Sequence, residues 1–124
     1  YIHSLDNKKL ADKLSNCEKN SSRKLKYFIQ VNIGNELQKS GITVSELDEF
    51  YNYCTIEKKL NIIGLMIIPP NEQNVDKYFK SLNELNSSLG LKELSMGMSS
   101  DYIQAVNFNA TFLRIGSLIF GPRN

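Results

Sequence analysis

Three features of the sequence predict an α/β protein built on a parallel sheet. Short apolar segments alternate with longer amphipathic segments along the whole chain, which is the strand–helix alternation of this class. The segment Leu60 to Ile68 is nearly continuously apolar, as expected for a strand buried on both faces. A third segment repeats its apolar residues at helical spacing, at Val75, Tyr78, Phe79, Leu82, Leu85 and Leu89. The order of segments predicts five strands separated by four helices.

The amino-terminal third contains two of the expected strands. Tyr1 to Leu5 forms a short first strand, and Asp6 is a candidate N-cap for a helix from Asn7 to Cys17. A polar loop covers Asn20 to Lys24. Tyr27 to Ile33, which is rich in aromatic and β-branched residues and is followed by a glycine, predicts the second strand.

The middle of the chain carries helix signals on both sides of the apolar strand. Thr43 with Glu46 three residues later is a capping-box pattern that predicts the second helix. Asn71 is the candidate cap of the third helix, and Gly90 is placed to end it as the C′ residue. The last two strands then follow, with a short helix between them.

Length and composition favour a single domain over residues 1–124. A net charge of +2 is too small to argue for a nucleic-acid partner, and the sequence contains no apolar run of the roughly 18 residues that a membrane span requires. Cys17 and Cys54 lack metal-ligand spacing, and we interpret them as reduced thiols on helix faces. We therefore expect a cytoplasmic protein without a metal site.

The last two strands each run into a small, polar turn. Leu94 to Asp101 ends in a serine-rich turn at a helix start, where free N–H groups and hydroxyls suit an anion. Phe112 to Gly121 places Arg114 just before a glycine and a serine. Taken alone, the serines and aspartate could be caps, the arginine a salt-bridge partner and the glycine a bulge. Parallel strands would bring both turns to one edge, where barrels often hold a phosphate.

These two segments resemble the signature of the pyridoxal phosphate homeostasis proteins, a family related in fold to the N-terminal domain of alanine racemase. The resemblance spans essentially the whole chain, and further matches are Gln30 to Ile33, Lys39 to Gly41, Gly64 to Met66 and, more weakly, His3 to Asp6. It implies a parallel (β/α)8 TIM barrel of the alanine racemase type. Because such a barrel typically needs about 250 residues, we expect this chain to cover about strands 4 to 8.

The resemblance also implies a site for pyridoxal 5′-phosphate (PLP). Ser99, Gly116 and Ser117 would hold its phosphate, Ser100 could add its amide, and Arg114 would face the pyridine nitrogen. An arginine keeps its proton, so it would leave that nitrogen unprotonated and weaken the ring as an electron sink.

No catalytic residue is assigned in this chain. In the family, the lysine that forms the Schiff base lies at the end of the first strand, so we expect it upstream of Tyr1. Lys39, in a loop after a strand, is the one lysine that we expect near the cofactor, and a surface role is the alternative. Met66 and Met98 are weaker candidate contacts, which we interpret mainly as barrel filling.

The resemblance implies a non-catalytic protein that binds PLP and takes part in intracellular vitamin B6 homeostasis. A PLP-dependent amino-acid racemase or a related enzyme is the alternative, but such an enzyme would need a second acid–base residue that the sequence does not offer. The expected partner is the small-molecule cofactor alone, without nucleic acid or membrane. We expect the intact protein to be a monomer or a weak dimer.

Overall fold

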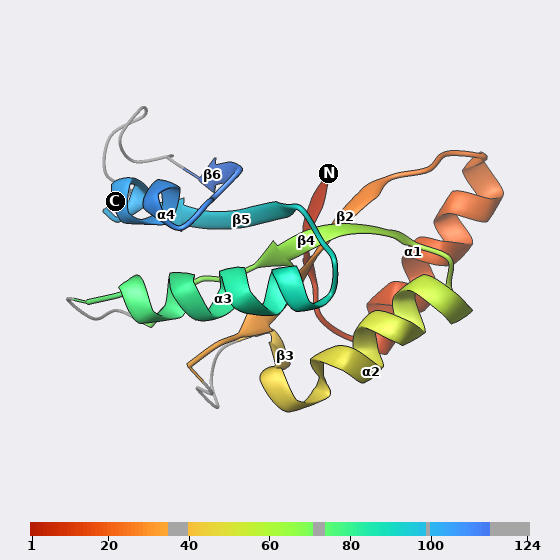
Figure 1. Cartoon of the computed structure of the whole chain (residues 1–124). Coiled ribbons are helices and arrows are strands. Elements are labelled where there is room, and N and C mark those ends of the chain that lie inside the picture. Colours follow the sequence, from red (N-terminus) through yellow and green to blue (C-terminus); the bar gives the residue numbers. More distant parts are fainter. Residues whose placement is uncertain (35–39, 71–73, 99, 115–124) are drawn as a thin grey trace.

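A single parallel sheet organises the molecule (Figure 1). The computed structural model describes residues 1–34, 40–70, 74–98 and 100–114. Within them the sheet order is β1-β2-β4-β5-β6, every neighbouring pair is parallel, and the two-residue strand β3 pairs with the end of β2. The strands are β1 (Ile2–Leu5), β2 (Lys26–Asn32), β3 (Ile42–Thr43), β4 (Asn61–Met66), β5 (Glu93–Met98) and β6 (Phe112–Arg114). The predicted α/β class and its five main strands are confirmed.

Helices connect these strands in the predicted alternation. They are α1 (Lys8–Ser21), α2 (Leu47–Asn52), α3 (Asp76–Ser88) and α4 (Tyr102–Asn107), with a 3₁₀ turn η1 (Val44–Glu46) before α2 and a π-helical segment η2 (Tyr53–Glu57) after it. Figure 1 shows α1, α2 and α3 on the same side of the sheet, and α4 contacts both β5 and α3.

The starts of α1 and α2 differ from the sequence prediction. Asn7, and not Asp6, is the N-cap of α1, because its side-chain oxygen accepts the Leu10 N–H at 2.8 Å. Asp6 instead accepts the backbone N–H of Gly41 at 3.0 Å. The Thr43 side chain makes no capping hydrogen bond, since the chain enters α2 through the 3₁₀ turn.

The other helix limits are also partly revised. Helix α1 continues to Ser21, so that the predicted loop begins two residues later than expected. Helix α3 begins at Asp76 after Val75, and the predicted cap Asn71 lies outside the described residues. Gly90 follows the end of α3 with φ of 73°, as predicted for a C′ glycine.

The helix-facing side of the sheet forms the main hydrophobic core. Alternate strand residues pack there against the helices, as the two-residue period of a strand requires. Buried members from the strands are Leu5, Tyr27, Ile29, Val31, Ile62, Leu65, Leu94 and Met96, and those from the helices are Ala11, Leu47, Phe50, Cys54, Phe79, Leu82 and Ala105. Burial raises the pKa of the Cys54 thiol to about 12, and both cysteines are free, as predicted.

The opposite, inner side of the sheet is filled by a different set of side chains. His3 stacks on Phe28 with ring centroids 4.4 Å apart, and its Nδ1 lies 2.6 Å from the Ser95 hydroxyl. Phe112 meets both rings edge-on and also lies 5.0 Å from the Tyr1 ring. Because β1 and β6 are the two ends of the strand order, these contacts show that the sheet curls around its inner side.

One asparagine holds the central strands together. Asn86 of α3 is 2% exposed; its side-chain oxygen accepts the Leu65 N–H, and its amide donates to the Glu93 carbonyl, each at 3.0 Å. Its amide therefore satisfies one buried donor and one buried acceptor on neighbouring strands.

We predict that Asn86→Ala will lower the free energy of unfolding by about 2–5 kcal/mol, because it leaves both backbone groups unpaired in the interior. Chemical denaturation measures this loss. The matched control is Asn83→Ala in the same helix, which should stay within about 0.5 kcal/mol of the parent. Equal losses in the two variants would contradict a special role for Asn86.

The lowered pKa of His3 predicts that the stability of the fold depends on pH. Burial is the main cause that lowers the pKa of His3 below its usual value, and the positive charge of Arg114 adds to it. The unfolded chain then binds the proton more readily, so stability is full above the unfolded pKa of about 6.5 and falls as the pH drops below it. Chemical unfolding at several pH values from about 7.5 to 5.5 measures this slope. His3→Gln should remove that slope, and an unchanged slope would assign it to other groups.

Candidate functional site

The carboxyl ends of β4, β5 and β6 bring several predicted site residues to one edge of the sheet. Met98 pairs in register with Arg114, and Met66 pairs with Gln30 and Ser95. Met66 is only 4% exposed, which fits the predicted filling role, whereas Met98 is 41% exposed at the end of its strand. The predicted filling role of Met98 stays a prediction.

Arg114 is the best-defined member of this edge. Its Nη2 donates to the backbone carbonyl of Ile67 at 2.6 Å, which ties the end of β6 to the chain just after β4. Its Nε is buried and has no hydrogen-bond partner among the described residues. The described part of the chain also gives it no carboxylate within ion-pair distance. The guanidinium is thus positioned by a carbonyl and keeps one buried donor for another acceptor.

Burial lowers the pKa of the Arg114 guanidinium from its usual value, and the negative charge of Asp101 opposes that shift. The side chain nevertheless remains a cation at physiological pH, because an arginine is not deprotonated in proteins. The edge of the sheet therefore presents a permanent positive charge and a pure hydrogen-bond donor.

The turn after β5 is closed by Asp101. Its carboxylate oxygen Oδ1 accepts the Met98 N–H at 2.6 Å, and its own N–H donates to the Met98 carbonyl at 3.1 Å. Asp101 is the N-cap residue of α4, but its side chain makes no bond to the helix N–H groups. The carboxylate therefore stabilises the turn, and Ser100 is exposed within it.

Gly97 allows α4 to lie directly on β5. Its φ is 104°, and a Cβ built there would lie 2.7 Å from Ala105 Cβ and 2.9 Å from Leu113 Cδ2. The signature glycine thus has a packing function that its place before a polar turn did not predict.

Four predicted residues, Ser99, Gly116, Ser117 and Lys39, lie outside the described residues, and their roles stay predictions. Sequence reasoning did not find the Ile67 carbonyl that positions Arg114, because a backbone group leaves no signal in the residue type.

The described ranges hold no group of three or more His, Cys, Asp or Glu side chains suited to a metal ion. Within these same ranges, no helix is both long and apolar enough to cross a bilayer.

The curled parallel sheet with helices on one side is half of a barrel of the alanine racemase type. PipY of Synechococcus elongatus PCC7942, solved with PLP bound, superposes with a TM-score of 0.87 at 31% identity over 97% of this chain and 60% of PipY. Alanine racemase of Corynebacterium glutamicum shares the fold alone, with a TM-score of 0.65 at 14% identity over 91% of this chain and 33% of the racemase.

The sequence comparison gives the same result. The family model described as "Alanine racemase, N-terminal domain" matches residues 1–124, and the chain belongs to that family. It is 39% identical to the pyridoxal phosphate homeostasis protein of Aquifex aeolicus over 98% of its own length, and 33% identical to that of Escherichia coli over all of it. The chain spans 58% and 56% of the lengths of these two relatives.

The close contact at Gly97 gives a prediction for this edge. Gly97→Ala should lower the free energy of unfolding by about 2–4 kcal/mol, because the new methyl group meets α4 and the backbone keeps a positive φ. Gly90→Ala is the control, since its φ of 73° is also positive but nothing lies within 4 Å. It should cost only about 1–2 kcal/mol. Thermal or chemical unfolding would separate the two, and equal losses would exclude the steric contribution.

Proposed function

We propose that the full-length protein that contains this chain binds PLP and serves its intracellular homeostasis, without catalysing a reaction of its own. The observation that carries this proposal is the buried Arg114 Nε donor, which lacks a partner among the described residues at the carboxyl ends of the strands. The PLP bound to PipY and the names of the curated relatives support it.

The residues at this edge fit the requirements of PLP. When bound, PLP supplies an electron sink for reactions at the Cα of amino acids. Arg114 would donate a hydrogen bond to the pyridine nitrogen. Because an arginine keeps its proton, it would not protonate that nitrogen. The proposed phosphate ligands are Ser99, Gly116 and Ser117, with the Ser100 amide as a weaker candidate. Lys39 is a weaker candidate for a contact near the cofactor ring.

The names of the curated relatives, which are homeostasis proteins, favour a carrier role over catalysis. Arg114 would weaken the ring as an electron sink, but the resemblance gives the racemases of this fold an arginine at the same place, so Arg114 alone does not separate the two roles. We also propose a cytoplasmic location and a monomer or weak dimer with the cofactor as its ligand. The two free cysteines support a reducing compartment.

Arg114→Lys in the full-length protein tests the site. The substitution keeps a positive charge but removes the Nε donor and the planar group, so we expect PLP affinity to fall by about tenfold and the cofactor absorption band to shift. Titration followed by absorbance measures both. Arg23→Lys, at an exposed position on the opposite edge, is the matched control and should change neither. An unchanged affinity and spectrum in Arg114→Lys would remove Arg114 from the site.

Deuterium exchange separates the carrier from the racemase. We expect the PLP-loaded, full-length protein to exchange the Cα proton of L-alanine no faster than free PLP at the same concentration. The exchange is followed by NMR in heavy water. Exchange many times faster than with free PLP, together with inversion to D-alanine, would establish the enzyme instead.

A further inference from the structure

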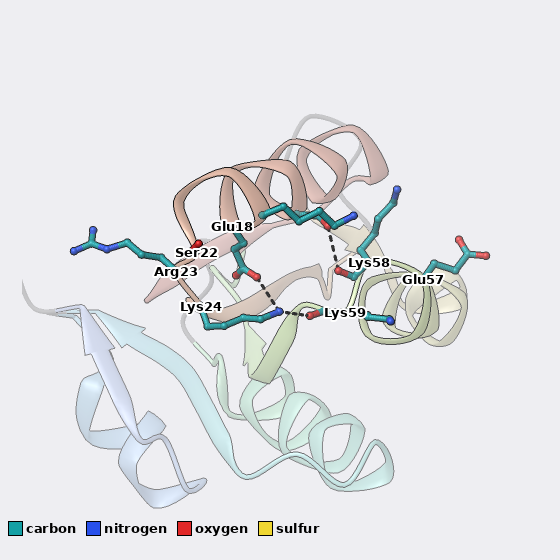
Figure 2. A pocket seen from close by; sticks show the side chains of 9 residues that line it. Glu18, Ser22, Arg23, Lys24, Glu57, Lys58 and Lys59 are labelled. Carbon is teal, nitrogen blue, oxygen red and sulfur yellow. Dashed lines mark hydrogen bonds and ion pairs between the residues drawn. The ribbon is translucent and has the colours of Figure 1, made fainter.

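A cleft lies at the opposite edge of the sheet, where the strands begin. Its volume is about 490 Å³, and it opens between the end of α1 and the end of η2 (Figure 2). Five of its nine lining residues are basic and two are acidic, so the lining carries a net charge of +3 (five minus two). The lining residues are Ser15, Glu18, Lys19, Ser22, Arg23, Lys24, Glu57, Lys58 and Lys59.

The floor of this basic cleft is fixed by hydrogen bonds. Glu18 is 6% exposed and accepts the Leu25 N–H at 3.1 Å and the Tyr27 hydroxyl at 2.5 Å. Burial alone would raise the pKa of Glu18, but the hydrogen bonds from Tyr27, Leu25 and Lys24 outweigh it and lower that pKa. The Ser15 hydroxyl donates to the Lys58 carbonyl at 3.2 Å. The floor is therefore a rigid polar surface.

One lysine bridges the two walls of the cleft. Lys24 Nζ lies 3.4 Å from a Glu18 carboxylate oxygen and 3.4 Å from the Lys59 carbonyl, as Figure 2 shows. This bridge joins the loop before β2 to the loop before β4. It brings the loops that carry Lys24 and Lys59 together at one cleft, whereas the Arg23 side chain is directed away from it (Figure 2).

Not all of these cations are paired. Lys24 is paired with Glu18, and Lys58 lies 3.1 Å from Asp12. Lys19, Arg23 and Lys59 are exposed, and the described residues place no carboxylate within ion-pair distance of them. Figure 2 shows Glu57 directed outward on one side of the cleft and Arg23 on the other, so Glu57 does not neutralise the interior.

The positive charge continues beyond the cleft along the same edge. Lys26 opens β2 and Lys92 immediately precedes β5, and both side chains are exposed. A row of cations at one edge attracts anions over a distance of about one Debye length. A ligand that carries several negative charges is attracted by all of these cations together, which raises its affinity.

Two helical segments end at this cleft, at Ser22 after α1 and at Lys58 after η2. Helix carboxyl ends carry partial negative charge, which offsets part of the attraction for an anion. A singly charged anion would therefore bind only weakly. A chain of phosphates can contact several unpaired cations at once and would bind more tightly. The cleft volume is within the range of small-molecule sites.

From these observations we propose that the cleft binds a small anion with two or more linked phosphate groups, as in inorganic polyphosphates and nucleoside triphosphates. This site is separate from the proposed PLP site, because it lies at the amino ends of the strands and uses none of the same residues. The proposal does not depend on PLP binding.

Calorimetric titration of the full-length protein with tripolyphosphate, ATP and AMP tests the proposal. The test variant is Lys19→Gln with Lys59→Asn, chosen because Lys59 has φ of 55° and asparagine tolerates that conformation. The control pair is Lys9→Gln with Lys13→Gln, which removes the same charge from exposed positions on α1 away from the lining. None of the four side chains is buried, so the fold should be retained, and thermal unfolding verifies that.

We expect tripolyphosphate and ATP to bind the parent protein, about tenfold tighter than AMP and more weakly as salt is raised. The variant Lys19→Gln with Lys59→Asn should bind tripolyphosphate and ATP about tenfold more weakly than the parent protein does. The control pair should weaken the binding of these two ligands by less than about twofold. ATP binding tighter than tripolyphosphate would identify nucleotides as the ligands, and equal binding would identify the phosphate chain. Undetectable tripolyphosphate binding, equal binding of AMP, or equal losses in both variant pairs would overturn the proposal.

Discussion

The amide of Asn86 is the interaction on which the centre of the sheet depends. Parallel strands need each buried N–H and carbonyl to find a partner, and this amide satisfies Leu65 on β4 and Glu93 on β5 from a helix. It therefore joins α3 to two strands at once. The Ile67 carbonyl that binds Arg114 lies only two residues beyond Leu65, so the geometry of the candidate PLP site depends on how β4 and β5 are held.

The two sides of the sheet are covered by different kinds of side chain. The helix-facing side is a conventional apolar core, in which helices cover alternate strand residues. The inner side instead combines aromatic rings with polar groups such as His3, Ser95 and Gln30, each held at a strand position. Because the rings of β1 and β6 meet there, the inner contacts fix the curvature, and curvature decides which strand ends come together.

Sequence patterns predicted the features that arise from periodicity, and they failed where one specific contact decides. The continuous apolar segment of β4 and the spacing in α3 were sufficient to predict a parallel sheet with covering helices. Asp6 and Asn7 are both good caps, and only the close approach of Gly41 to Asp6 decides between them. The bridging role of Asn86 is likewise hidden, since an asparagine inside an amphipathic helix has no pattern that distinguishes it. Arg114 was predicted from its motif, but its carbonyl partner was not.

The stacked rings on the inner side have a consequence for how the two edges of the sheet communicate. His3, Phe28 and Phe112 fill the concave side at the level between the amino and carboxyl ends of the strands, which makes it a plug and not a passage. Within the described residues, a ligand at one edge is separated from the other edge by these packed rings. The same rings connect β1, β2 and β6, so a displacement of one of these strands would be passed on to the others.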